Sequence, residues 1–399
     1  MSLQLLTDRM KFAFFIKSLV FPGGGAERVF CGVVNGLSDR GHDCVVVTFD
    51  DGQEEFFYQL HSSIEIERLS ASTPGRSTPR RNLPRIMKST RKIAQRYKPD
   101  AAVAFMHSTY VPVAFAFAGT GVPLVVSEHT SAAHYSGRPL QRRLARVAQQ
   151  MAYAKTVVST QVYEEHPKSW RKNLHVLANP VDLTEYAAAQ RNFPSDGLIL
   201  CLGGLRPEKD QLTLISAFDR VASEFPEWRL RLVGDGTERP AIEARIAQSQ
   251  YRSRIELPGV IRDVAGEYAK ASIVAMPSRY ESLGLVAIEA MASGRPVVGF
   301  ADCAGAATLI QHGVNGLLAE AGVDRARSLA ESLRTLMADR GLCIAMGMRA
   351  PPTIQHYSID AIVGQWEGLL LAAATSRANV PALDGRKNEL VGKPEGHGG

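Results

Sequence analysis

Short apolar segments alternate with segments of helical periodicity along most of this 399-residue chain. The first cycle is an apolar run at residues 12–20, a glycine turn, a helical pattern at 26–40 and a second apolar run at 43–49. Such runs predict buried strands, and strands that alternate with helices pair in parallel. The alternation therefore predicts an α/β fold built from doubly wound, Rossmann-like sheets.

The chain is too long for one hydrophobic core, so we expect two domains. The alternating pattern lapses at residues 186–196, which we interpret as a linker, and then resumes. The pattern predicts one Rossmann-like domain at 1–190, a second at 191–350, and a helix at 351–375 that packs back toward the first. Residues 376–399 are polar and contain Gly and Pro, a composition typical of a disordered tail.

Charge and cysteine content narrow the class of protein. The net charge of +6 suggests an anionic partner, and five scattered cysteines without metal-ligand spacing suggest buried thiols in a reducing compartment. The uncharged stretch at 101–126 is interrupted by polar, Gly and Pro residues, so we expect two strands around a short helix rather than a membrane span. With no signal-peptide pattern at 12–20, the sequence predicts a cytoplasmic protein.

The strongest local signal lies at residues 277–296. A loop with Glu281 leads into a short apolar helix near Gly284, in which Glu289 is the only charge. A buried carboxylate needs hydrogen-bond donors, and the two hydroxyls of a ribose are a suitable pair. The N–H groups of Ser282, Leu283 and Gly284 at the helix start favour a diphosphate, with Glu281 beside the group attached to it. The alternatives are that Glu289 lies on a solvated surface and that Glu281 is an ordinary N-terminal cap of the helix.

Two loops after predicted strands carry further candidates. Arg206 and Lys209 follow Gly203 and Gly204 at a strand end, where parallel sheets bind anions, so the two cations are placed to neutralise a leaving diphosphate. His129 follows an apolar strand of the first domain and is placed to hydrogen-bond a sugar near its reacting carbon. Alternatively, the cations are ordinary surface charges and His129 is structural.

A glycine-rich turn, Gly23-Gly24-Gly25-Ala26-Glu27-Arg28, separates the first predicted strand from the first predicted helix. Glycines allow the backbone to approach a phosphate or sugar closely at a helix start. The turn lacks the GxGxxG spacing of dinucleotide-binding proteins, so an oxidoreductase fits poorly. A plain tight turn is the alternative.

Taken in order, these motifs resemble those of glycosyltransferase family 4, whose members have the GT-B fold of two Rossmann-like domains facing across a cleft. The stretch from Glu281 to Glu289 is similar to the E-x7-E motif of the family, and residues 203–209 resemble its G-R-L-x-x-E-K loop. Residues 24–27 resemble its G-G-A-E turn, and residues 179–182 its N-P-V-D segment. The arginine position of the G-R-L-x-x-E-K loop is Gly204 here, which leaves Arg206 as the candidate replacement.

The resemblance implies a retaining, metal-independent glycosyltransferase that moves a hexose or N-acetylhexosamine from a UDP-sugar to a glycan or polyprenyl-diphosphate-linked saccharide. The first domain would bind the acceptor and the second the nucleotide sugar, which is a substrate, so no cofactor is expected. The loop 127–130 resembles that of bacterial hexosaminyltransferases in the family, and GDP-mannose is an alternative donor. The absence of an Asp-x-Asp motif agrees with metal independence.

The implied site residues fall into two groups. The expected catalytic residues are His129, Glu281, Lys209 and Arg206. In the donor site Glu289 would hold the ribose, and backbone near Gly259 and Val260 would contact the base. The full donor-binding set is Gly24, Gly25, Gly204, Gly259, Val260, Ser282, Leu283, Gly284, Leu285 and Glu289.

A basic helix face is predicted within residues 68–100, which hold many Arg and Lys residues. On a helical wheel its cations form one stripe opposite an apolar face. We expect the stripe to contact an acidic membrane at the inner face of the plasma membrane, or the pyrophosphate of a lipid-linked acceptor, and not nucleic acid. Arg138, Arg142, Arg143 and Arg146 would add to this field, although a solvated basic face is the alternative. The stripe consists of Arg81, Arg85, Lys88, Lys92 and Arg96.

Two other functions are compatible with the same motifs. A sugar-nucleotide epimerase of this fold would process its substrate without an acceptor, whereas a transferase would release UDP only when an acceptor is present. A non-catalytic sugar-nucleotide-binding subunit would show no turnover as a purified chain.

Overall fold

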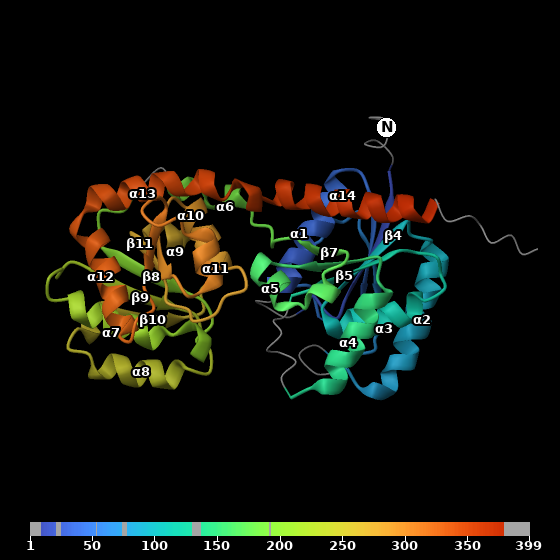
Figure 1. Ribbon diagram of the computed structural model, residues 1–399, viewed down its shortest axis with the longest axis horizontal. Helices are drawn as coiled ribbons and strands as arrows, with labels where there is room; N and C mark the ends of the chain where they lie inside the picture. Colours follow the sequence, from blue (N-terminus) through green and yellow to red (C-terminus); the bar gives the residue numbers. More distant parts are fainter. Residues whose placement is uncertain are drawn as a thin grey trace, which may run out of the picture.

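The computed structural model describes residues 9–20, 25–52, 54–73, 78–129, 137–190 and 193–378. Two sheets form two lobes that lie side by side (Figure 1). The first sheet has the strand order β3-β2-β1-β4-β5-β6-β7 and the second the order β10-β9-β8-β11-β12-β13. All strand pairs in both sheets are parallel. This topology confirms the predicted fold class of two doubly wound α/β units.

The first domain is the lobe that carries β1 to β7. Its strands are β1 (Lys11–Ile16), β2 (Asp43–Thr48), β3 (Glu65–Arg68), β4 (Ala101–Phe105), β5 (Leu124–Glu128), β6 (Ala154–Val157) and β7 (Leu174–Val176). Its helices are α1 (Gly25–Asp39), α2 (Leu83–Tyr97), α3 (His107–Phe117), α4 (Pro139–Met151) and α5 (Thr160–Glu165). The predicted pair of strands around a short helix at 101–126 is confirmed by β4, α3 and β5.

The second domain carries the remaining strands. They are β8 (Leu198–Leu202), β9 (Arg229–Val233), β10 (Ile255–Gly259), β11 (Ile273–Met276), β12 (Val297–Phe300) and β13 (Gly316–Ala319). The helices that follow the first domain are α6 (Leu183–Gln190), α7 (Gln211–Val221), α8 (Arg239–Gln248), α9 (Val264–Lys270), α10 (Leu285–Ala292), α11 (Ala304–Leu309), α12 (Arg325–Ala338), α13 (Arg340–Thr353) and α14 (Ile359–Ala378).

The first sheet is buried on both faces because each face is covered by helices. Alternate residues of β1 belong to different cores: Phe14 packs with Phe30 of α1 and Trp366 of α14, whereas Phe15 packs with Phe117 of α3. Strands with two covered faces are apolar throughout, which is why the sequence shows continuous apolar runs here rather than alternation.

The chain crosses between the lobes at two places that lie against each other. The N–H group of Val181 donates to the carbonyl of Tyr357 at 2.9 Å, and Val181 forms a parallel bridge with Ser358. After the second crossing, α14 packs on α1 and β4 of the first domain, and in Figure 1 it continues the line of α13 across the top of the molecule. The last described helix thus belongs to the first domain, although it follows the second domain in sequence.

The structure differs from the sequence interpretation at the predicted linker, 186–196. Residues of α6 precede and overlap this stretch, and Tyr186 is buried in the core of the second domain, where α6 packs on α9 and α10. The helix was missed because it is only eight residues long and has two buried residues, Tyr186 and Ala189, which are too few to show a helical period. The first crossing therefore lies near Val181, ahead of the predicted position.

Two other expectations concern burial. All five cysteines are buried and unpaired, as predicted. Within the described ranges, no helix combines the length and the apolar character that crossing a membrane requires.

Candidate active site

Three neighbouring strands of the second sheet end in glycine turns that pack against one another. The N–H group of Gly234, after β9, donates to the carbonyl of Gly259, at the end of β10, at 2.8 Å. A Cβ atom on Gly234 would lie 2.0 Å from the carbonyl oxygen of Gly203, and both residues have φ near 140°. Side chains are therefore excluded, so this edge offers backbone that a ligand can approach closely.

Lys209 and Glu281 are brought together beside these turns. They form an ion pair between the loop after β8 and the loop after β11. Ser278 Oγ donates to Oε1 of Glu281 at 2.8 Å, and both side chains of the ion pair are largely buried. A Cβ atom on Gly305, at the start of α11, would lie 2.6 Å from that of Glu281. The Glu281 carboxylate is therefore held in one orientation by a cation, a hydroxyl and a close backbone.

The start of α10 presents unsatisfied backbone donors next to this pair. Gly284 caps the helix in a left-handed conformation with φ 76°. The N–H groups from Ser282 to Val286 have no hydrogen-bond partner among the residues that the structure describes. Free N–H groups and the positive end of the helix dipole favour an anion here, as the sequence predicted for a diphosphate.

Glu289 lies one turn further along α10 and faces the first domain. Its Oε1 accepts from Nη1 of Arg28 at 2.8 Å, and its Oε2 accepts from the Tyr268 hydroxyl at 2.9 Å. Burial raises the pKa of Glu289, whereas Arg28 and Tyr268 lower it by stabilising the charged form. The alternative of a solvated Glu289 is wrong, because its side chain is only 7% exposed.

Arg28 was not among the predicted site residues. It is the last residue of the stretch Gly23 to Arg28, lies in the first turn of α1, and is 261 residues from Glu289 in sequence. The signal that could have drawn attention to it was a lone arginine at a helix start next to a proposed ligand loop. Nothing in the sequence pairs it with a particular carboxylate.

Arg206 lies beside the glycine that replaces the arginine of the family motif. The Nε atom of Arg206 is 3.4 Å from the place that a Cβ on Gly204 would occupy. The guanidinium is two-thirds exposed, and its nearest carboxylate is Glu208 at 4.0 Å. Its charge is therefore available near the position where the family motif has one.

His129 comes from the first domain, immediately after β5. Its Nε2 is 2.9 Å from Ser127 Oγ, which also accepts from Thr156 at 2.8 Å. The imidazole stacks on Phe105 at 5.0 Å between ring centroids, and Trp366 stacks on the same ring at 5.6 Å. Burial lowers the pKa of His129 to about 4, so the ring is neutral at physiological pH.

The remaining predicted residues are placed as follows. Gly25 begins α1. Gly259 ends β10 and the exposed Val260 follows it, at the edge that carries the glycine turns. Gly24 lies outside the described residues. The site residues come from the loops that follow strands and from the first turns of the helices after them. Contacts that join the two domains here include Arg28 of α1 to Glu289 of α10, and the Tyr280 hydroxyl to Glu165 of α5 at 3.3 Å. The two carboxyl edges therefore face each other.

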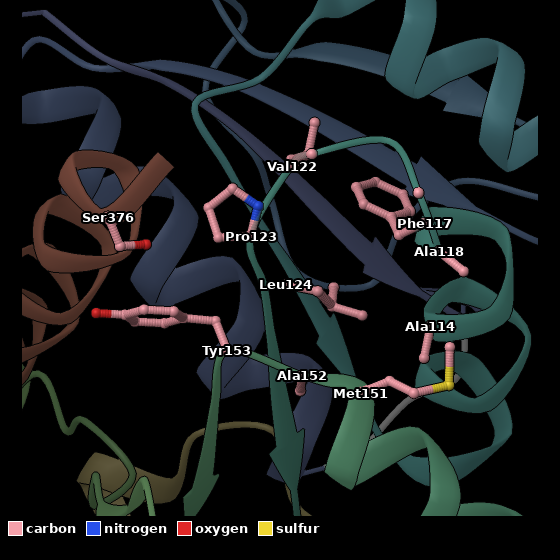
Figure 2. Close-up of a pocket in the computed structure, with 12 residues that line it drawn as sticks. Ala114, Phe117, Ala118, Val122, Pro123, Leu124, Met151, Ala152, Tyr153 and Ser376 are labelled. Atoms are coloured by element: carbon pink, nitrogen blue, oxygen red, sulfur yellow. The ribbon is translucent and has the colours of Figure 1, made fainter. Parts of the chain in front are cut away.

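A separate hollow of about 340 Å³ lies at the opposite edge of the first sheet. Figure 2 shows Tyr153 and Ser376 on one side of it and Phe117 and Met151 on the other. It is lined by the first residue of β5 and the ends of α3 and α4, so it is not part of the candidate site.

Comparisons with known proteins agree with this geometry. Residues 23–185 match the family described as Glycosyltransferase Family 4, and residues 196–339 match the family described as Glycosyl transferases group 1. An uncharacterized glycosyltransferase of Haemophilus influenzae is 26% identical over 90% of this chain and 99% of its own length. A Campylobacter jejuni protein is 25% identical over 90% of this chain and 98% of its own, and its name describes an α-1,4-N-acetyl-D-galactosaminyltransferase acting on an undecaprenyl-diphosphate-linked saccharide.

Solved structures confirm the fold. Sucrose-phosphate synthase from Thermosynechococcus elongatus superposes with a TM-score of 0.78 at 20% identity, covering 92% of this chain and 100% of that one. Anabaena Alr3699/HepE, solved in complex with UDP, gives a TM-score of 0.73 at 22% identity, covering 91% and 100% of the two chains. The arrangement of two facing Rossmann-like domains is the predicted GT-B fold.

Proposed function

The chain belongs to the glycosyltransferases that these two family descriptions cover, and on that premise we propose that it moves a hexose or N-acetylhexosamine from a UDP-sugar to a glycan or polyprenyl-diphosphate-linked saccharide. The observation that carries the proposal is the gathering of Lys209, Glu281 and unpaired N–H groups at the start of α10, with Glu289 facing the other domain. The cations and backbone amides of this array would bind a diphosphate, and its buried carboxylate would bind a ribose.

Each group has a role that follows from its place. Lys209, Arg206 and the N–H groups from Ser282 to Leu285 would neutralise the charge that grows on the diphosphate as the bond to the sugar breaks. Glu289 would accept the ribose hydroxyls, while Gly259 and Val260 would lie against the base. Cations and helix dipoles at this place supply the charge that a metal ion would otherwise provide, which supports metal-independent transfer.

The sugar would lie between the two domains. Glu281, fixed by Lys209 and Ser278, would contact the transferred sugar from the second domain. Neutral His129 would contact it from the first domain, near the reacting carbon, where Gly25 would allow close approach. The acceptor oxygen would bond to that carbon on the face the diphosphate leaves, and its proton would pass to the departing diphosphate. Retention is supported by the resemblance of the Glu281–Glu289 stretch to the motif of a retaining family.

The donor is proposed to be a UDP-sugar on two grounds. HepE, which shares the fold, was solved with UDP, and the Campylobacter relative is named as an N-acetylgalactosaminyltransferase. GDP-mannose is the competing donor. A thermal-shift screen should separate them, because a ligand at 100 times its Kd adds about 2.7 kcal/mol of stability.

The decisive experiment combines this screen with product analysis. We expect a UDP-sugar to raise the melting temperature most. With this donor, the purified chain should release UDP only when a lipid-linked saccharide is present, and EDTA should not affect the release. The NMR spectrum of the product should show that the anomeric configuration of the donor is retained. Lys209→Ala and Glu289→Ala should each lose this response, whereas Lys172→Ala, an exposed lysine of the first domain, should not. Parent-like behaviour of folded Lys209→Ala and Glu289→Ala variants would refute the proposal, and acceptor-independent conversion of the donor would indicate an epimerase.

The acceptor side is proposed to meet an acidic membrane. Arg81, Arg85, Lys88 and Lys92 are exposed and form no ion pair within the described part of the chain. Arg96 belongs to the predicted stripe but pairs with Glu67 at 2.7 Å, so it adds little to the field.

An exposed apolar stripe on α4 supports the same contact. Leu140, Leu144, Val147 and Met151 recur at helical spacing and are 37–58% exposed. Arg142 and Arg143 on the same helix are exposed, Arg146 stacks over Trp170 at 4.3 Å, and α3 lies between α4 and the basic α2 (Figure 1). Apolar side chains next to cations suit the interface of an anionic bilayer, which would place the enzyme on the inner face of the plasma membrane.

Vesicle binding tests this contact. The double variant Arg85→Glu/Lys88→Glu should lose co-sedimentation with phosphatidylglycerol vesicles, while Lys172→Glu/Arg252→Glu, which changes net charge equally, should bind as the parent does. Equal binding by both double variants would contradict the membrane proposal without affecting the donor site.

A further inference from the structure

Arg28 is the point at which the first domain reaches the proposed ribose carboxylate. Its guanidinium lies 2.8 Å from Oε1 of Glu289, 3.3 Å from the Tyr186 hydroxyl and 3.5 Å from Glu185. The Arg28 side chain is one-third exposed and that of Glu289 nearly buried. The only described cation paired with Glu289 therefore comes from the opposite domain.

The surroundings of Glu289 explain why that cation matters. Burial raises the pKa of Glu289, and the largest opposing effect is the charge of Arg28, followed by its hydrogen bonds from Tyr268 and Arg28. Titratable groups from several elements surround Glu289. They are Glu27 and Arg28 on α1, Tyr58 in the segment after β2, Glu185 and Tyr186 on α6, and Tyr268 on α9. Among them, the cation in contact is Arg28.

The hydrogen-bonding capacity of the carboxylate leaves room for a ligand. Two carboxylate oxygens offer about four acceptor positions. Arg28 uses one on Oε1 and Tyr268 one on Oε2, so one position remains on each oxygen. A pair of neighbouring hydroxyls can use both without displacing either partner.

We propose that Arg28 is a positioning residue for the donor, which from the first domain orients the Glu289 carboxylate and supplies its counter-charge. The inference rests on the proposed function, because it assumes that Glu289 receives the ribose. It adds that nucleotide binding by the second domain depends on a side chain of the first. Tight donor binding then requires the two domains to be in contact.

The experiment measures the Kd of UDP, or of GDP if the thermal-shift screen selects it, by calorimetry at pH 6.0 and pH 8.5. The proteins are the full-length parent, Arg28→Met, Arg28→Lys, Glu289→Gln and Arg40→Met. Arg40 is a matched control, since it follows the same helix and pairs with Glu367 and Asp360 at 2.5 Å, away from Glu289. Ratios to the parent at each pH cancel the titration of the nucleotide itself.

We expect Arg28→Met to weaken binding by about tenfold at pH 6.0. The effect should be smaller at pH 8.5, because without Arg28 burial favours the neutral carboxyl, and this form becomes less populated as pH rises. Arg28→Lys should restore much of the loss, and in turnover Arg28→Met should raise the donor KM more than it lowers kcat. Arg40→Met should match the parent at both pH values, and equal melting temperatures exclude a folding defect.

Several results would count against the inference. Unchanged binding by Arg28→Met would overturn it, and tighter binding would show that Arg28 competes with the ribose instead of supporting its ligand. If Glu289→Gln weakens binding and Arg28→Met does not, the inference alone fails. If Glu289→Gln binds the nucleotide as the parent does, or if neither nucleotide binds, the proposed ribose site fails and the inference falls with it.

Discussion

Arg295 shows how this fold accommodates a charge that has no exposed surface. Its guanidinium donates to the carbonyls of Tyr268, Ala189 and Ala269, each at 3.0 Å, and stacks on Phe193 at 4.9 Å. Burial lowers the pKa of Arg295 to about 10, so it stays charged at neutral pH. Its hydrogen bonds connect α6 to α9, and so they hold the segment after the first crossing on the second domain.

Replacing Arg295 by lysine should therefore destabilise the protein although the charge is kept. A single ammonium group cannot reach three carbonyls in different directions, and buried acceptors left unpaired cost about 3 kcal/mol in total. Urea unfolding of Arg295→Lys should show this loss, and the exposed Arg252→Lys should show none. Equal urea midpoints for the two variants would mean that the hydrogen bonds of the Arg295 guanidinium do not contribute to stability.

His129 makes a second prediction at this scale, through pH. Its pKa is lowered to about 4, against about 6.5 in an unfolded chain, so between these values the unfolded state binds a proton that the native state does not. Stability therefore falls as pH decreases from 6.5 to 4, by about 3 kcal/mol at most.

The variant His129→Gln removes this contribution, so its unfolding free energy should depend less on pH over that range than that of the parent. In the parent, the His129 ring should show no NMR titration above about pH 5.5. A titration midpoint near 6.5 would contradict the burial argument.

At the scale of elements, the loop before α10 depends on the helix beside it. Because a Cβ on Gly305 of α11 would lie 2.6 Å from the Cβ of Glu281 and 2.7 Å from its carbonyl oxygen, any side chain there must push the loop away. Glycine at this position thus decides where the Glu281 carboxylate sits.

The variant Gly305→Ala should lower kcat by about tenfold or more, because a displacement of about 1 Å at a reacting group has effects of this size. The control Gly322→Ala, where a Cβ would have no atom within 4 Å, should be fully active. Steady-state kinetics with the donor chosen by the thermal-shift screen decides, and full activity of Gly305→Ala would show that the loop tolerates the shift.

The elements that the sequence predicted are those with a strong hydrophobic pattern. The strand β2 and the helix α1 lie within about two residues of the predicted positions, and α10 begins one residue after Gly284, because buried faces impose continuous apolar runs or helical periodicity. The strand β1 ends at Ile16, four residues before the end of the apolar run at 12–20. The strand β3 was missed since it lies at the edge of its sheet, and Ile66 is its one apolar residue. The helix α6 was missed for a similar reason.

In the candidate site, too, some residues could be predicted from the sequence and others could not. Lys209, Glu281 and Glu289 lie in ordered motifs near strand ends, so sequence spacing and sheet topology were enough to bring the first two together. The contact of Arg28 with Glu289 depends on how two separate domains meet, and no local pattern encodes that. Nor does a local pattern pair Arg96 with Glu65 and Glu67, which come from the edge strand β3 of the same domain.

For the whole molecule, the last described helix, α14, packs against α1 and β4 of the first domain. Trp366 is 1% exposed and stacks on Phe105, whose ring also stacks with His129. Close packing continues at Gly36 of α1, where a Cβ would lie 2.5 Å from a methyl group of Val363. The helix therefore supports both the core and the loop that carries His129.

Truncating Trp366 to alanine should cost about 3–5 kcal/mol of stability, the usual range for large aromatic residues in a core. Transfer activity should fall as the His129 loop loses its support, while UDP binding in the second domain should be close to that of the parent. Urea unfolding, calorimetry and kinetics check the three outcomes, with the exposed Met348→Ala of α13 as the control. A stability loss without loss of turnover would separate the core role of α14 from its role at the site.

The neighbouring crossings at Val181 and Ser358 restrict how the lobes can move. Two segments bonded to each other bend as one, so the lobes are expected to turn about a single line that passes close to Val181. Groups near that line would shift little, and loops far from it would separate most. The enzyme can then admit a fresh sugar nucleotide and release the spent one by such a turn, with both sheets and the packing of α14 on the first domain left intact.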